Sequence, residues 1–217
     1  MCRDSEGNIL ANLRASTMFD NDLTHRVKRI YEAIGNLEER DLGSLKAYHV
    51  KTEKFVFLHQ DFSGGQSNEH LANAAHSLIY NINNLYDHLR RFARYNGMDE
   101  SMVKQVFRET SELRVLRDLS NSDKHGYDGR PGHSGIAPRL GYVHRIMKLT
   151  TGSQVGSWVT MRLGPEGIPV KSGPGSAKAI ITADILDKDG RTIGSLNDIA
   201  DRALAAWEQL LKSLRVG

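Results

Sequence analysis

Residues 67–97, SNEHLANAAHSLIYNINNLYDHLRRFARYNG, carry the longest helical pattern in the chain and decide the fold. Apolar side chains recur at steps of three and four, which places them on one face of an α-helix. They are Leu71, Ala75, Leu78, Ile82, Leu85, Leu89 and Phe92. Ser67 is a typical first residue for a helix, and Asn96-Gly97 is a typical end. The stretch therefore predicts one long amphipathic helix.

A further helical pattern begins near Asp99 and ends in the segment SNSDKHG, residues 120–126. The positions expected to be buried are Met102, Val103, Val106, Phe107, Leu113, Leu116 and Leu119. The connection between the two patterns, YNGMDE, is short, so the helices are expected to pack antiparallel as a hairpin. This helical hairpin, residues 67–125, is the predicted core of the protein.

Helical and strand patterns flank the hairpin on both sides. Residues 21–42 have helical spacing up to Gly43-Ser44, and residues 46–62 read as two strands with KTEK as the turn. The Gly- and Pro-rich loop 126–139 is the best internal boundary. Residues 139–194 form a β-rich extension with three strand-like segments and a turn at Asp189-Gly190.

The C-terminal residues 195–214 predict an amphipathic helix, with Ser195 and Asp198 resembling a capping box. Trp158 and Trp207 are most economically explained as core residues. The first twenty residues show no clear period and are expected to be weakly ordered. Taken together, the patterns predict a single α+β domain over residues 1–217, because the strands are too few and short for a separate core.

Composition narrows the class of protein. The chain has 217 residues, of which 39% are hydrophobic and 25% charged, as in ordinary globular proteins. No apolar run reaches the roughly 18–20 residues of a membrane crossing, and the N-terminus does not resemble a secretory signal. The lone cysteine, Cys2, excludes an internal disulfide. These features predict a cytoplasmic protein without membrane contact.

The net charge of +3 permits contact with nucleic acid but does not demand it. Polar residues line two neighbouring edges of the long helix: His76, Tyr80, Asn83 and Asp87 on one, Asn84, His88 and Arg91 on the other. In an antiparallel hairpin, the first set could face Asn121 and His125. The alternative interpretation is an ordinary solvated helix surface.

The segments LANAAHSLIYNINNLYDHLRRF and LRVLRDLSNSDKHG resemble bacterial proteins of HEPN type (higher eukaryotes and prokaryotes nucleotide-binding). In those proteins an Asn-rich helix ending in Asp-His-Leu precedes a helix that closes on Asn-x-x-Lys-His. The resemblance covers Leu71 to Gly126 and does not extend to the β-rich region. It implies a helical hairpin fold that commonly forms a homodimer.

Catalytic HEPN proteins are endoribonucleases that need no metal and carry an Arg-x(4–6)-His motif. The resemblance therefore implies that Arg117 stabilises charge on the RNA phosphate and that His125 transfers the proton. It implies RNA as the substrate, no cofactor, and a toxin or phage-defence setting. The supporting or substrate-binding residues implied in the same way are Asn121, Lys124, Asp118, Arg114, Asp87, His88 and Asn84.

The spacing departs from the family pattern, since seven residues separate Arg117 from His125. In a continuous helix they would lie about 12 Å apart along the axis. The two residues could then meet at one phosphate only if the helix ends before His125, which Asn121 makes credible, or if a dimer brings two copies together. Otherwise Asn121 caps the helix, Arg117 pairs with Asp87, and His125 donates to a backbone carbonyl.

Other kinds of site have weaker support. His88, His125 and His133 with a nearby aspartate lack a recognised metal-ligand spacing, so no metal is expected. The Gly-rich pieces around residues 129–135 and 172–178 lack the P-loop arrangement and are interpreted as turns. A small-molecule enzyme has no motif to support it. The alternative to the ribonuclease is a non-catalytic HEPN-like protein that dimerises through the hairpin and binds a partner or ligand.

Overall fold

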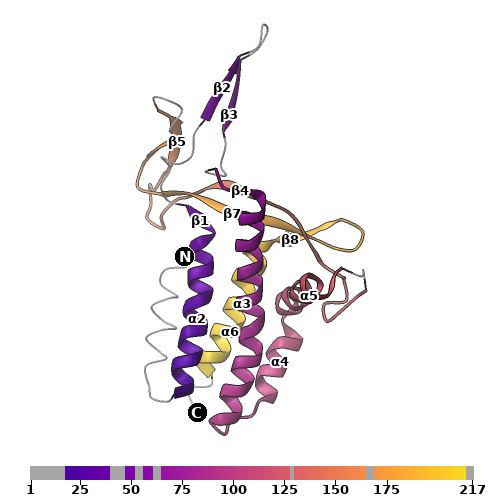
Figure 1. Ribbon diagram of the computed structural model, residues 1–217. Coiled ribbons are helices and arrows are strands. Elements are labelled where there is room, and N and C mark those ends of the chain that lie inside the picture. Colours follow the sequence, from indigo (N-terminus) through magenta and orange to yellow (C-terminus); the bar gives the residue numbers. More distant parts are fainter. Residues whose placement is uncertain are drawn as a thin grey trace. The chain divides into compact units, whose positions relative to one another are not determined.

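A computed structural model describes residues 18–39, 47–51, 56–60, 65–127, 130–164 and 169–213. In these residues helices are combined with small antiparallel sheets, which confirms the predicted α+β class (Figure 1). The N-terminal residues 1–17, and the KTEK turn apart from Lys51, lie outside the described residues. Among the described helices, none has the length and apolar character that a membrane crossing requires.

Five helices are present in this part of the chain. They are α2 (Met18–Asn36), α3 (Asn68–Tyr95), α4 (Ser101–Glu109), α5 (Ser111–His125) and α6 (Leu196–Ser213). The strands are β1 (Glu38–Glu39), β2 (Ala47–Lys51), β3 (Val56–Gln60), β4 (Arg139–Thr150), β5 (Thr160–Leu163), β6 (Pro169–Ser172), β7 (Ser176–Leu186) and β8 (Thr192–Ser195).

The chain divides into two compact units, each built from separate segments of sequence. The first comprises the described residues of 1–34, 75–142 and 183–217, and the second those of 35–74 and 143–182. The Gly- and Pro-rich loop 126–139 lies within the first unit, so the predicted boundary there is wrong. The chain passes from one unit to the other after Ile34, Ala74, Tyr142 and Thr182 instead.

Helix α3 begins and ends where the sequence predicts. The Ser67 hydroxyl accepts a hydrogen bond from the His70 amide at 3.2 Å, which satisfies one of the free amides of the first turn. At the other end Gly97 has a φ of 67°, and the Met98 amide donates to the Ala93 carbonyl at 2.8 Å. A left-handed glycine in this position closes the last turn and reverses the chain.

The prediction of a second continuous long helix is wrong, because the helix is broken at Thr110 into α4 and α5. Thr110 has φ −92° and ψ 108°, an extended conformation that no helix continues through. Thr-Ser at this point favours a helix boundary, since both side chains are poor in helix interiors and good near caps. The Arg114 guanidinium donates to the Arg108 carbonyl that the break leaves without a partner in its own helix.

Helix α2 also differs from the prediction, since it ends at Asn36 rather than at Gly43-Ser44. Gly35, a poor helix former, stands next to this end, which hydrophobic spacing alone did not reveal. Glu38–Glu39 then forms β1, which pairs antiparallel with β7 at Ile180 and Ala179. Lys178 on β7 donates to the Glu38 carboxylate, so an ion pair accompanies the strand pairing.

The strands follow the prediction in part. Strands β2 and β3 form the expected antiparallel hairpin, and β7 and β8 flank the expected turn at residues 187–191. Of the segment predicted as a strand over 153–163, only β5 is one, and its partner β6 was not predicted. The main sheet has the order β1-β7-β4, with β8 also paired to β7.

The apolar stripe of α3 is buried from Leu71 to Leu89, and Trp207 of α6 is only 1% exposed. In the first unit the Trp207 ring lies 6.3 Å from the Tyr86 ring, which is itself 4.7 Å from the Phe107 ring. Three expectations of burial are wrong: Met102 is 37% exposed, Trp158 is 50% exposed, and Val106 is only partly buried. The predicted cap of α6 is present at Ser195, whose hydroxyl accepts from the Asp198 amide at 3.2 Å.

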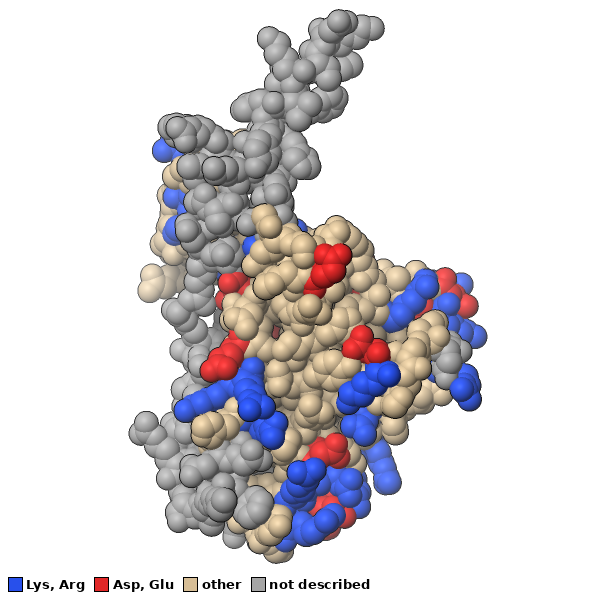
Figure 2. Space-filling view, in the orientation of Figure 1, with Lys and Arg blue, Asp and Glu red and all other residues tan. Residues whose placement is uncertain are grey.

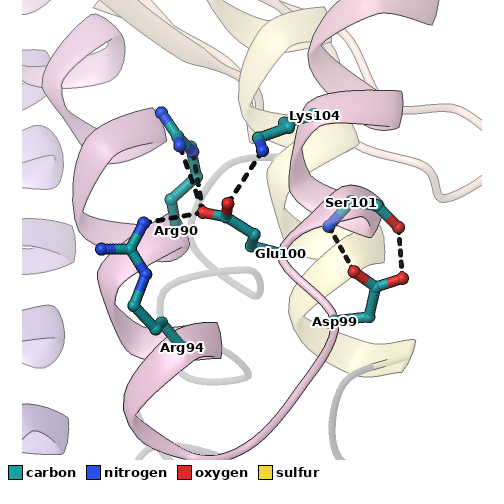
Figure 3. A network of polar contacts seen from close by, with 6 residues as sticks. All are labelled: Arg90, Arg94, Asp99, Glu100, Ser101 and Lys104. Atoms are coloured by element: carbon teal, nitrogen blue, oxygen red, sulfur yellow. Dashed lines mark hydrogen bonds and ion pairs between the residues drawn. The ribbon is translucent and has the colours of Figure 1, made fainter.

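The turn between α3 and α4 is fixed by a carboxylate that gathers three cations (Figure 3). Glu100 accepts from Arg90 and Arg94 of α3, each at 3.1 Å, and from Lys104 of α4 at 2.8 Å. These hydrogen bonds, with that of Lys104 the largest, lower the pKa of Glu100 to about 2. The carboxylate therefore stays ionised and holds the two helix ends together.

Candidate functional site

The polar side chains of helix α5 form two sets that differ in what they contact. Arg117, Ser120 and Asp123 recur at steps of three and contact α3. Asp118, Asn121, Ser122 and His125 recur at steps of one, three and four and lie beside the loop 130–138. The residues that the sequence singled out are therefore distributed over two different surroundings.

The face toward α3 is a network of hydrogen bonds centred on Asn83, a side chain that is only 5% exposed. Its amide nitrogen donates to the Ser120 hydroxyl at 3.2 Å, and its oxygen accepts from the Arg117 guanidinium at 3.3 Å. The same guanidinium lies 3.7 Å from an Asp87 carboxylate oxygen. Arg117 is thus held between two residues of α3. This agrees with the alternative interpretation, in which Arg117 pairs with Asp87.

In the first unit, Asp123 near the end of α5 contacts His76 and Tyr80 of α3. The Tyr80 hydroxyl donates to the Asp123 carboxylate, whose other oxygen lies 3.5 Å from Nδ1 of His76. The hydrogen bond to this carboxylate raises the pKa of Tyr80 to about 12. The Lys124 ammonium lies 5.0 Å from the centre of the Tyr80 ring, a cation–π distance.

Together these contacts run antiparallel, with α3 positions 76–87 meeting α5 positions 123–117 in reverse order. The antiparallel packing of the two helices agrees with the prediction. The predicted contact partners are different from those observed. His76 and Tyr80 contact Asp123, and Asn83 contacts Ser120. The expected partners, Asn121 and His125, lie beside the loop 130–138 instead.

The other face of α5 borders a groove of about 680 Å³, here called the α5 groove. Its polar lining comes from the last turns of α5 and from the loop that follows: Asp118, Asn121, Ser122, His125, Arg130 and His133. The rest of the lining consists of Gly126, Pro131, Gly132, Ala137 and Pro138. The groove combines two imidazoles and a guanidinium with a carboxamide and a hydroxyl.

Asp118 holds the loop that forms one side of this groove. The side chain is 5% exposed, and its two oxygens accept the backbone amides of His133 at 2.9 Å and Ser134 at 2.7 Å. Gly132 lies so close that a Cβ there would be 2.3 Å from Oδ1 of Asp118. The Phe107 ring meets the His133 ring edge-on at 5.6 Å. Asp118 therefore anchors the loop, which is a positioning role.

The structure does not bring Arg117 and His125 together within one chain. Helix α5 continues through His125, so the expectation that it ends earlier is wrong. Eight residue steps of continuous helix separate the two side chains by about 12 Å along the axis and by about 80° around it. His125 borders the groove and Arg117 is held against α3, so a single phosphate cannot meet both in one copy.

The remaining predicted site residues lie away from the groove. Arg114 is used at the break between α4 and α5, and Lys124 lies over Tyr80. Asn84 and His88 are partly exposed residues of α3. Two groove residues, Arg130 and His133, were not predicted as a pair with His125. The signal was present, since the Gly-rich loop that carries both follows directly after a helix ending in Lys-His.

The chemistry of the groove favours an anion over a cation. Within the described residues, no three His, Cys, Asp or Glu side chains are grouped so that they could hold a metal ion. Asp118, the carboxylate of the groove, already receives two amide hydrogens. Guanidinium and imidazole N–H groups are donors to phosphate or carboxylate oxygens.

The chain matches no known family model, no curated protein and no solved structure. The chemistry of the residues just described is therefore the basis for assigning a function.

Proposed function

We propose that the chain is a HEPN-like protein that binds RNA at the α5 groove without cleaving it. The observation that carries this proposal is that Arg117 is held against α3, whereas His125, about two turns further along α5, borders the groove. Cleavage needs a charge-stabilising group and a proton-transferring group at the same phosphate. A binding site needs only donors placed along the ligand, and the groove offers them.

The size and lining of the groove suit a nucleotide unit. A volume of about 680 Å³ lies within the range of about 300–1,000 Å³ that small-molecule sites occupy. Arg130 supplies a planar guanidinium for a phosphate, and the His125 and His133 imidazoles add further N–H donors. Asn121 and Ser122 offer hydrogen bonds to a base or to a ribose hydroxyl.

The distribution of charged side chains on the surface favours contact with a short stretch of RNA. On the visible face of the described residues, Lys and Arg lie in small groups beside Asp and Glu, without a continuous basic stripe (Figure 2). A net charge of +3 agrees with this distribution. RNA binding by such a surface depends on a few phosphate contacts and should weaken moderately with salt, since each contact releases about one counterion.

The remaining parts of the proposal follow the HEPN resemblance. The protein is proposed to be cytoplasmic, to form a homodimer through the helical hairpin, and to act in a toxin or phage-defence setting. Arg117, Asn83 and Asp87 then hold the hairpin in shape, while His125 contacts RNA. This division of roles explains the overlong Arg–His spacing, because a binding protein does not need the two side chains at one phosphate.

The test is binding and cleavage of a fluorescent single-stranded RNA by the full chain. We expect a rise in anisotropy without cleavage, and a loss of affinity of about tenfold in Arg130→Ala, the usual range for one charge-assisted contact. Lys212→Ala, which removes the same charge from an exposed position of α6, is the matched control and should bind normally. Absence of RNA binding would contradict the proposal.

A cleavage assay in EDTA separates this function from the ribonuclease. Intact RNA after long incubation supports binding alone. Metal-independent cleavage that disappears in a folded His125→Ala protein would overturn the proposal and establish the nuclease. That result would require a dimer to bring Arg117 of one copy near His125 of another, which sedimentation of the wild-type protein would then have to show.

A further inference from the structure

Trp158 in the second unit is exposed although tryptophan is normally covered. Half of its surface is open to solvent, whereas Trp207 in the first unit is 1% exposed. Tryptophan is enriched at interfaces, because its ring offers a large apolar surface together with an N–H donor. The position lies outside the HEPN-like segment and outside the α5 groove.

The ring is held in place by the turn after β6. The Trp158 carbonyl accepts the Gly175 amide at 3.0 Å, and Gly173 lies against the indole. A Cβ at Gly173 would be 2.7 Å from Cε3 of Trp158, and the φ of Gly173 is +97°. Both facts require glycine there. The indole is therefore supported by backbone, with part of its surface left open.

Lys171 fixes the same turn from the side. Its ammonium donates to the carbonyls of Gly173 at 2.8 Å and Gly175 at 2.7 Å. Both acceptors are neutral carbonyls, so these two contacts hold the lysine without neutralising its charge. The result is an aromatic ring and a cation that are both held against one short turn.

The surrounding sequence is strongly one-sided in charge. Residues 143–182 contain one acidic residue, Glu166, and the basic residues Arg145, Lys148, Arg162, Lys171 and Lys178. Of these, Lys148 on β4 and Arg162 on β5 are exposed. Over β5, the described surface visible in Figure 2 is tan and blue. Such a surface is complementary to a polyanion.

We propose that Trp158 is a stacking platform for a base of single-stranded RNA, with Lys148 and Arg162 as contacts to the backbone phosphates. The inference takes RNA as the ligand from the proposed function, and assigns it a second, separate site. An aromatic ring on a rigid support combined with basic side chains is the common design of single-strand binding surfaces. A protein partner that covers apolar surface would not need the excess of positive charge, and a membrane would favour a projecting ring over one supported by backbone.

Tryptophan fluorescence tests this directly, since Trp207 is buried and contributes a constant background. Titration of the full chain with an unlabelled oligouridine should quench the emission of Trp158 in a saturable way. Trp158→Ala should bind labelled oligouridine about tenfold more weakly, and Trp158→Phe within about threefold of wild type, because phenylalanine still stacks. Val155→Ala, a change at another exposed apolar position of the same loop, should bind normally.

The outcomes separate this site from the α5 groove. RNA binding by anisotropy without quenching, or normal binding by Trp158→Ala, would overturn the platform and leave the groove proposal standing. Quenching that persists in Arg130→Ala supports the platform even if the groove proposal fails. A blue shift of Trp158 on anionic phosphatidylserine vesicles, without quenching by oligouridine, would overturn it in favour of a membrane surface.

Discussion

The two faces of α5 differ in how their polar side chains are used. On the face toward α3, Arg117, Ser120 and Asp123 each have a protein partner on α3. On the other face, Asn121 and His125 border a groove of about 680 Å³. Polar residues of one helix thus serve packing on one side and border a groove on the other.

This difference shows that an Arg and a His on one helix do not by themselves define a joint site within one copy of the chain. Arg and His in one helix suggest a joint active site, yet their separation along the helix decides whether they share an environment. Here Arg117 belongs to the packed face and His125 to the open one. Substitutions on the packed face should therefore change stability, and those on the open face should change binding.

The largest effect is expected at Asp118, which belongs to the open face but is buried. Asp118→Ala leaves the amides of His133 and Ser134 without their acceptor and should lower the free energy of unfolding by about 3 kcal/mol. It should also abolish RNA binding, since the loop with Arg130 is released. Urea unfolding and anisotropy measure the two effects.

Gly132→Ala offers an independent check on the same anchor. Its Cβ would meet the Asp118 carboxylate, so it should reproduce the loss of binding and cost about 2 kcal/mol. Gly135→Ala is not a suitable control because Gly135 has a φ of +79°. If Gly132→Ala bound RNA normally, the loop would not depend on Asp118.

The next effect is expected at Asn83, the centre of the packed face. Asn83→Ala removes a buried partner of both Ser120 and Arg117 and should lower the free energy of unfolding by about 2 kcal/mol. RNA affinity of the folded fraction should not change, because Asn83 does not border the groove. A tenfold loss of affinity at full folding would show that the two faces are coupled.

A smaller effect separates Arg117 from His125. Arg117→Ala should lower the free energy of unfolding by about 1 kcal/mol, as expected for a partly exposed polar contact, with RNA affinity retained. His125→Ala should change stability by less than about 0.5 kcal/mol and weaken RNA binding. The reverse pattern in paired urea and anisotropy measurements would contradict the assignment of the two faces.

Hydrophobic spacing predicted the helices well where buried stripes were long. The stripe from Leu71 to Leu89 and the caps at Ser67 and Ser195 are present as expected. Spacing alone missed the break at Thr110, because the apolar positions before and after it keep a helical period. It could not show the pairing of β1 with β7 either, since a two-residue strand has no pattern.

The candidate site was less predictable than the fold. Helical geometry alone sets Arg117 and His125 about 12 Å apart along the axis once α5 is known to reach His125. The groove, however, depends on a loop whose path is set by hydrogen bonds to Asp118. A sequence pattern does not reveal such long-range backbone contacts. For the same reason, the support of Trp158 by Gly173 appears only in the structure.

The smallest expected effect lies at Tyr80, on the packed face. Hydrogen bonding to Asp123 raises the pKa of Tyr80 from its ordinary value of 10.0 to about 12. A raised pKa means that the contact stabilises the fold fully below pH 10 and is lost as the pH rises toward 12. The stability difference between wild type and Tyr80→Phe should therefore shrink over this range in urea unfolding. Asp123→Asn should move the tyrosine titration, followed by ultraviolet absorbance, back toward pH 10, and an unchanged titration would remove Asp123 as the cause.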